Sequence, residues 1–145
     1  MDLSLYFEPV TAESLHIPDA ESMNDRLLRR VLMYNPKVSL DISEADIAIV
    51  GVPESRNAHR NPSCSLAPDE VRRQFYQLYA WRKEVRIIDL GNLRCGATVE
   101  DTYLAMAEVL AYLIENKVVP IVLGGSNDLA YANYRAYELM ERVAN

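Results

Sequence analysis

The most chemically distinctive stretch of the chain is residues 118–128, an apolar run that ends in two glycines and three polar residues, Ser126, Asn127 and Asp128. A buried strand that delivers polar side chains to the start of a helix is where α/β proteins keep their chemistry. The same side chains can instead cap the helix expected over 129–143, and the turn before a helix attracts small anions. A serine nucleophile is not supported, because no base stands at identifiable spacing from Ser126.

A second polar segment, the loop at residues 54–66, is expected to overhang this cluster. Glu54 at its start can approach Asp128 as a pair of carboxylates. His59 can serve as a ligand or base, although a loop histidine without a partner carboxylate is usually just solvated. We therefore expect binding groups from two loops to meet at one end of a sheet.

Three apolar runs of strand length, each followed by a segment with helical periodicity, must position these loops. The strands are expected at 47–52, 85–90 and 118–123. The inward stripes of the first two helices are expected to be Val71, Phe75 and Leu78, then Met106, Leu110 and Leu113. Near-continuous apolar strands alternating with helices predict an α/β fold with a parallel sheet covered on both faces.

The first forty residues show a weaker pattern. Residues 1–18 have no clear period and are expected to form an arm on the surface. Residues 19–32 are expected to be a helix, because Leu27, Leu28 and Val31 recur at three- and four-residue spacing. We expect one α/β domain over residues 1–145, with three βα units in 46–145.

Four segments carry a resemblance to a known family. They are Asp46-Ile47-Ala48-Ile49-Val50-Gly51-Val52-Pro53, Ala67-Pro68-Asp69-Glu70-Val71-Arg72, Val85-Arg86-Ile87-Ile88-Asp89-Leu90-Gly91-Asn92-Leu93 and Pro120-Ile121-Val122-Leu123-Gly124-Gly125-Ser126-Asn127-Asp128-Leu129-Ala130-Tyr131. They resemble the first strand, the Gly-Pro-x-x-[Ile/Val]-Arg helix start, the Val-x-Asp-x-Gly-Asp element and the Gly-Gly-x-His-[Asp/Glu] motif of the arginase, agmatinase and formiminoglutamase (ureohydrolase) family. The likeness is to its N-terminal portion, is formiminoglutamase-like and spans about 46–137. Together with right-handed crossovers, it implies a three-layer αβα fold with the strand order 2-1-3.

The resemblance also implies a chemistry. Family members hydrolyse a guanidino or formimino C–N bond, using paired manganese ions to activate water. Asn127 stands where the family has a ligand histidine, with Asp128 after it, and an amide is a weak ligand for such an ion. The family's other ligand motifs, Asp-x-His-x-Asp and Asp-x-Asp, do not occur here and are expected beyond residue 145. We expect the chain alone to need no cofactor and to be inactive, with no catalytic residue, and with Asn61 and Ser126 as substrate-binding candidates.

Two functions remain open. In the first, the chain is the N-terminal part of a ureohydrolase-like enzyme and supplies one wall of a site for a small guanidino or formimino compound. In the second, it is a non-catalytic relative that acts as a binding or interaction module. In the order 2-1-3, residues 118–123 lie at a sheet edge, so we expect a homo-oligomer or association there.

Composition narrows the partners and the compartment. The net charge of −6 and the pI near 4.9 disfavour binding to nucleic acid or to an anionic membrane, because both need lysine and arginine to neutralise phosphate. The sequence has no apolar run of membrane-spanning length and no basic secretion signal at its start, so the cytoplasm is the expected location. Cys64 and Cys95 are expected to be free thiols.

Overall fold

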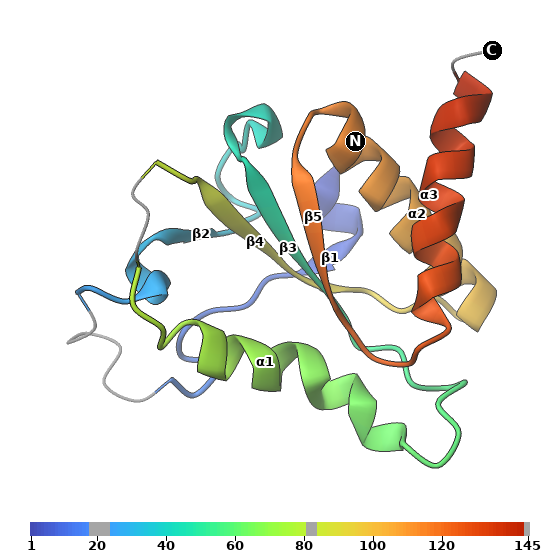
Figure 1. The fold of residues 1–145 in the computed structure, drawn as a ribbon, viewed down its shortest axis with the longest axis horizontal. Helices are drawn as coiled ribbons and strands as arrows, with labels where there is room; N and C mark the ends of the chain where they lie inside the picture. The colour runs from blue at the N-terminus through green and yellow to red at the C-terminus, as the bar shows by residue number, and fades with distance from the viewer. Residues whose placement is uncertain (18–23, 81–83, 144–145) are drawn as a thin grey trace.

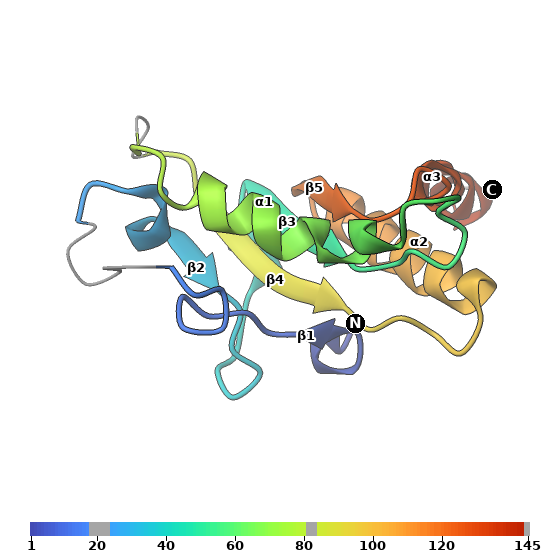
Figure 2. The same cartoon turned by 90° about the horizontal axis from the view of Figure 1, so that it is seen from below.

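The fold is built on one mixed sheet, with α1 on one face and α2 and α3 on the other (Figures 1 and 2). The computed structural model describes residues 1–17, 24–80 and 84–143. The strands are β1 (Phe7–Glu8), β2 (Val31–Met33), β3 (Ile47–Val52), β4 (Ile87–Leu93) and β5 (Val119–Gly124). The α-helices are α1 (Ala67–Phe75), α2 (Val99–Glu115) and α3 (Leu129–Val143). None of the helices in the described ranges combines the length and apolar character needed to cross a bilayer.

The three predicted βα units are present, as β3-α1, β4-α2 and β5-α3, which confirms the three-layer α/β class. β3 is buried along almost its whole length because helices cover both of its faces. α2 begins with a capping box, in which the Asp101 amide donates to Thr98 Oγ1 at 3.1 Å and the Thr98 amide donates to Asp101 Oδ2 at 2.8 Å. Its inward stripe of Met106, Leu110 and Leu113 is buried as predicted.

The predicted strand order is wrong for the sheet as a whole. The observed order is β1-β4-β3-β5, with β2 also paired to β4, so two strands extend the sheet beyond the three predicted ones. β1 runs antiparallel to β4, and the sheet is therefore not purely parallel. The cause is that the outer side of β4 presents unpaired backbone groups, which these two N-terminal strands satisfy. β5 pairs with β3 and is an edge of the sheet within the described part of the chain.

The N-terminal segment is part of the core, and the prediction of a surface arm is wrong. Phe7 and Leu15 are each only 1% exposed. The predicted helix at 19–32 is also wrong where it can be compared, because Leu27–Arg29 forms a short 3-10 helix and β2 follows it; residues 19–23 lie outside the described residues. Val31 is buried opposite Ile87 of β4, so pairing with an open strand prevails over the local helical spacing.

The buried face of α1 is also different from the predicted one. Val71 and Leu78, expected to point inward, are 46% and 49% exposed. The face that meets the sheet instead carries Pro68, Arg72 and Tyr76, which are buried at four-residue spacing. Phe75, the third residue of the predicted stripe, is partly buried and packs against the apolar cluster that contains Ile49 and Tyr76. Polar as well as apolar groups therefore attach the helix to the sheet.

Arg72 is the centre of that attachment and is fully buried. Its Nε and Nη2 donate to the two carboxylate oxygens of Asp89 in β4, at 2.7 and 2.9 Å. Nη1 donates to Asn92 Oδ1 at 2.6 Å, and the Tyr76 hydroxyl donates to Asp89 Oδ2. Burial and the Asp89 charge raise the pKa of Tyr76, so its phenol stays protonated and remains a donor. The charged pair thus lies inside a satisfied network, as a buried pair requires.

Candidate functional site

The candidate site lies where the carboxyl ends of β3 and β5 meet. The loop that follows β3 and the turn that follows β5 run side by side at the lower right of Figure 1. Their contact is direct, because the Ser126 amide donates to the Glu54 carbonyl at 2.9 Å. The segments predicted from the sequence to converge are therefore together, at the end of the sheet where α/β proteins bind ligands.

Gly125 makes this close approach possible. A Cβ atom at this position would lie 1.9 Å from the Glu54 carbonyl oxygen, whereas one at Gly124 would meet nothing closer than Leu129 at 3.4 Å. Ser126 is 7% exposed, and its hydroxyl also donates to the Glu54 carbonyl, at 3.3 Å. The structure therefore gives Ser126 a role in joining the two loops, and its substrate-binding role stays a prediction.

Glu54 is 1% exposed and forms an ion pair with Arg56, whose Nε donates to Glu54 Oε1 at 3.0 Å. The Arg56 hydrogen bonds hold the pKa of Glu54 below its ordinary value despite its burial. The guanidinium also reaches the start of α2, donating to the Ala97 carbonyl at 2.8 Å and to Thr102 Oγ1 at 3.1 Å. The beginning of the loop is thus clamped to the next βα unit.

Asp128 is held by donors from two other segments. Its Oδ2 accepts hydrogen bonds from Asn57 Nδ2, at 3.2 Å, and from the Tyr103 hydroxyl of α2. Burial raises the pKa of Asp128, but the neighbouring Ser126 and Tyr103 hydroxyls and the Asn57 amide lower it more, so the pKa lies below its ordinary value. Oδ1 is buried and accepts no hydrogen bond from any described residue. Glu54 and Asp128 each have their own partners, and no contact joins the two carboxylates.

Replacing Tyr103 with phenylalanine should raise the pKa of Asp128, because the lost hydroxyl donates to the ionised carboxylate. Because the pKa of Asp128 is lower in the folded chain than in the unfolded chain, its carboxylate stabilises the fold above the unfolded pKa. This stabilisation is lost as the pH falls through the folded pKa, and it should be smaller in Tyr103→Phe. Carboxyl carbon NMR titration measures the pKa directly. Tyr131→Phe is the matched control, because it removes a hydroxyl that does not donate to Asp128 from a ring packed edge-on against Tyr103, with the ring centroids 5.8 Å apart. Equal pKa values in wild type and Tyr103→Phe would contradict the assignment.

Asn127 is exposed at the tip of the turn, and the backbone, not its side chain, begins α3. The amides of Leu129, Ala130 and Tyr131 donate to the carbonyls of Ser126, Asn127 and Asp128. Manganese prefers carboxylate and imidazole ligands, and the amide of Asn127 is neutral. In the described ranges, no three histidine, cysteine, aspartate or glutamate side chains gather into a possible metal site. The residues present therefore do not fit a manganese centre.

The other predicted site residues lie in the loop after β3. His59 and Asn61 are both exposed, and in the described residues neither side chain forms a hydrogen bond or ion pair with Ser126, Asn127 or Asp128. Asn57 and Tyr103, the two side chains that donate to Asp128, were not among the site residues predicted from the sequence. Their own sequence context gives no signal, because one lies in an irregular loop and the other on a helix whose tyrosines usually pack in cores.

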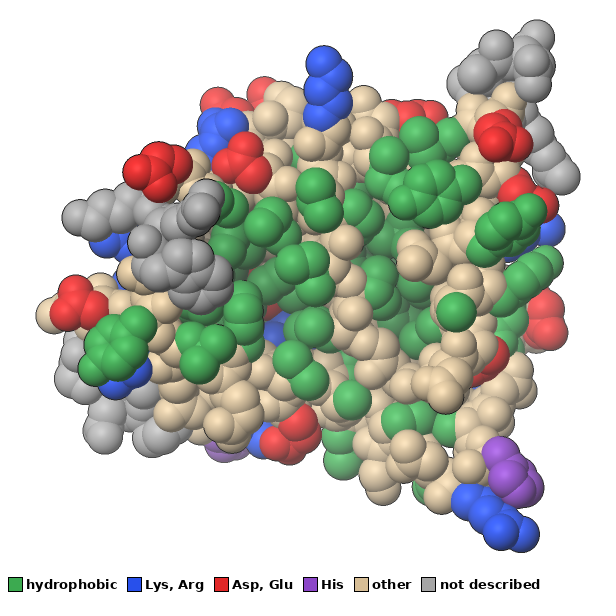
Figure 3. Space-filling view, viewed as in Figure 1, with side chains coloured by type: hydrophobic (Ala, Val, Ile, Leu, Met, Phe, Trp, Pro, Cys, Tyr) green, Lys and Arg blue, Asp and Glu red, His purple; other side chains and the backbone are tan. Residues whose placement is uncertain are grey.

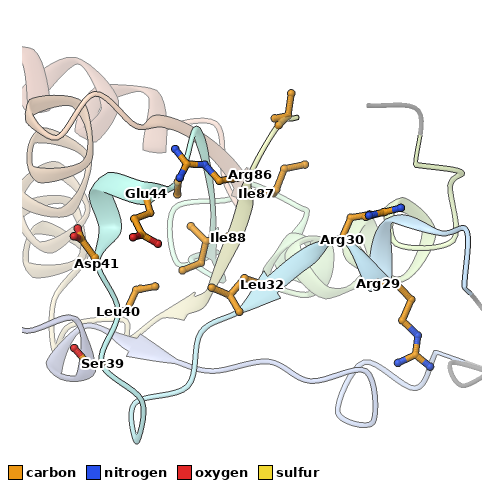
Figure 4. Close-up of a pocket in the computed structure, with 12 residues that line it drawn as sticks. Arg29, Arg30, Leu32, Ser39, Leu40, Asp41, Glu44, Arg86, Ile87 and Ile88 are labelled. Carbon is orange, nitrogen blue, oxygen red and sulfur yellow. The ribbon is translucent and has the colours of Figure 1, made fainter. Parts of the chain in front are cut away.

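A hollow of about 430 Å³ lies at the other end of the sheet, near the amino ends of β2 and β4. Figure 4 shows Leu32, Leu40 and Ile88 around its centre, while the Arg29 side chain points away from it. Parallel sheets place their ligands at the carboxyl ends of the strands. The cluster around Asp128 is therefore the better candidate.

Comparisons with known proteins show which family this chain resembles. The model of a family described as the arginase family matches residues 45–143. A formimidoylglutamase of Hahella chejuensis is 28% identical over 96 residues, covering 64% of this chain and 29% of the relative. A formimidoylglutamase of Citrobacter koseri is 26% identical over 118 residues, covering 79% of this chain and 38% of the relative. An agmatinase of Pyrococcus horikoshii is 24% identical over 109 residues, covering 69% of this chain and 38% of the relative.

A solved structure has the same fold over most of the chain. It comes from Clostridium difficile, is described as an agmatinase candidate, and matches with a TM-score of 0.60 at 18% identity. The match covers 72% of this chain and 40% of that one. The chain thus spans about a third of the length of the curated relatives it matches.

Proposed function

The chain belongs to the arginase family, and from that premise we propose that it supplies one wall of an arginase-type site without a manganese centre of its own. The wall is formed by the carboxyl ends of β3 and β5, with Asn127 and Asp128 at its tip. The ligand class is a small guanidino or formimino compound, as the names of the relatives suggest. Asn61 and Ser126 remain the proposed substrate-binding residues.

The observation that carries this proposal is the chemistry at the end of β5. By the resemblance of residues 120–131 to the family's motif, Asn127 takes the position of the ligand histidine. Its neighbour Asp128 already accepts two hydrogen bonds. Paired metal ions need several charged or imidazole ligands to bring the pKa of bound water near neutrality. Asn127 and Asp128 alone cannot replace this set of metal ligands, so turnover requires ligands from outside residues 1–145.

We expect the isolated chain to bind no Mn²⁺ at micromolar concentration and to release neither urea nor ammonia from arginine, agmatine or formiminoglutamate. Titration calorimetry and product-release assays measure both. Asn127→His should not restore activity, because a single imidazole leaves the ion otherwise held by water. Micromolar binding together with turnover by the wild-type chain would overturn the proposal.

A second candidate function is a non-catalytic interaction module. The observation that favours it is β5, which in the described residues pairs only with β3 and bears exposed apolar side chains. The two candidates differ in one measurable respect. A catalytic part gains Mn²⁺-dependent turnover when the remainder of an arginase-family fold is supplied, whereas an interaction module does not.

A further inference from the structure

The hollow at the amino ends of β2 and β4 is separate from the candidate functional site. Its volume of about 430 Å³ lies in the range of pockets that bind small molecules. In the described chain its walls come from the segments 29–32, 39–45 and 85–88. The hydrophobic side chains gathered across the middle of Figure 3 belong to the face that contains β5, a strand that contributes no lining residue from the described chain. The hollow is therefore a feature of the N-terminal strands.

The floor of the hollow is apolar and belongs to the sheet. Leu32 of β2 is paired in register with Ile88 of β4, so the two side chains stand on the same face. Ile88 is 1% exposed, whereas Leu32 is 59% exposed, and Leu40 lies beside them (Figure 4). An apolar group that entered the hollow would remove the Leu32 side chain from water, which favours binding.

Glu44 places a carboxylate on the wall of the hollow. It ends the short 3-10 helix Ile42–Glu44, which Asp41 caps by accepting a hydrogen bond from the Ser43 amide at 3.0 Å. Ile42 is 3% exposed, so this helix is anchored in the core. The Glu44 carboxylate extends toward Ile88 in Figure 4 and forms no hydrogen bond or ion pair with any described residue. It is therefore available to a cationic group in the hollow.

Two arginines supply the opposite charge. Arg86 is held near Glu44, because its amide donates to Asp46 Oδ2 at 2.7 Å and its Nε lies 3.7 Å from the same oxygen. Its Nη groups donate to no described residue. Figure 4 shows Glu44 and Arg86 on one side of the hollow and Arg30 on the other. A guanidinium beside a carboxylate favours a ligand that carries both charges, because a guanidinium binds carboxylates and a carboxylate binds ammonium groups.

We propose that this hollow binds a free α-amino acid with an apolar side chain, such as leucine. The ammonium group of the ligand meets the Glu44 carboxylate, and its carboxylate accepts hydrogen bonds from the Nη groups of Arg86. Its side chain lies over Leu32 and Ile88, and the aliphatic stem of Arg30 closes the far side. An anion alone would face Glu44, and a cation alone would face Arg86. The inference does not depend on the proposed function, because the two sites lie at opposite ends of the sheet.

A titration followed by nuclear magnetic resonance, with four small probes, tests the class of ligand. L-leucine at millimolar concentration should shift the amide resonances of Leu32, Glu44 and Ile88 and leave those of Ser126 and Asp128 unchanged. Glycine lacks the apolar side chain, isoamylamine lacks the carboxylate and isocaproate lacks the ammonium group, so each should bind at least about tenfold more weakly than leucine. If leucine shifted none of the three resonances in the hollow, or if the amine or the acid bound as tightly as leucine, the proposal would be overturned.

Glu44→Gln and Arg86→Met test the two charged contacts in the chain itself. Each should raise the dissociation constant of leucine at least about tenfold, because each leaves one charged end of the ligand without its partner. Glu115→Gln is the matched control for Glu44→Gln, since Glu115 is exposed at the end of α2, outside the hollow. Circular dichroism checks that the variants fold. Equal leucine affinity in Glu44→Gln and Glu115→Gln would contradict the proposed site.

Discussion

Replacing Arg72 with methionine should lower the free energy of unfolding by about 3–5 kcal/mol, the usual cost of removing one partner from a buried ion pair. The variant leaves the Asp89 carboxylate buried, and among the described residues its remaining donors are the Tyr76 hydroxyl and the Gly91 amide. Such a loss is a large fraction of the stability of an ordinary domain. Urea unfolding followed by circular dichroism measures it.

The matched control is Arg86→Met. Arg86 also pairs with an aspartate, but its Nε lies 3.7 Å from Asp46 Oδ2 and its side chain is 60% exposed. Its loss should therefore lower the free energy of unfolding by at most about 1 kcal/mol. The double variant Arg72→Met with Asp89→Leu should recover part of the loss, because it removes the stranded charge. Equal destabilisation by Arg72→Met and Arg86→Met would show that the buried network does not attach α1 to the sheet.

The same network explains why the orientation of α1 could not be predicted from hydrophobic periodicity. A pattern based on apolar residues assigns Val71, Phe75 and Leu78 to the core and arginine to solvent. The true inner face is set by the pairing of Arg72 with Asp89, which lies within an apolar strand seventeen residues later in the sequence. An aspartate inside such a strand is the signal that a buried cation is needed.

The elements that could be predicted are those with strong local patterns. β3 and β5 are short apolar runs, and α2 combines a capping box with a regular buried stripe. β1 and β2 have two and three residues, too few for a period to be visible, and they form because β4 offers unpaired backbone. Their existence depends on the rest of the fold and not on their own sequence.

The candidate site shows a similar division. The turn carrying Asn127 and Asp128 could be placed from the sequence, because a strand followed by glycines and a helix fixes where its residues lie. The donors to Asp128 could not, since Asn57 and Tyr103 are 71 and 25 residues away along the chain. Contacts between distant segments depend on how the helices pack on the sheet, which local pattern does not determine.

The two glycines of the turn should respond very differently to alanine. Gly125→Ala places a methyl group against the Glu54 carbonyl oxygen, at 1.9 Å, so the loop after β3 must separate from the turn after β5. We expect this to cost about 1–3 kcal/mol of unfolding free energy, as overpacking does. It should also break the hydrogen bond from the Ser126 amide to Glu54, which hydrogen exchange at Ser126 detects.

Gly124→Ala is the control within the same turn, because its added methyl group meets only Leu129, at 3.4 Å. Both variants remove one glycine and therefore reduce the flexibility of the unfolded chain equally. Any difference between them reports the close approach at Gly125. Urea unfolding at protein concentrations low enough to keep the chain monomeric compares the two. If Gly125→Ala proved as stable as Gly124→Ala, with Ser126 still protected, the two loops would not be joined at Glu54 as the structure places them, and the cluster around Asp128 would lack its support.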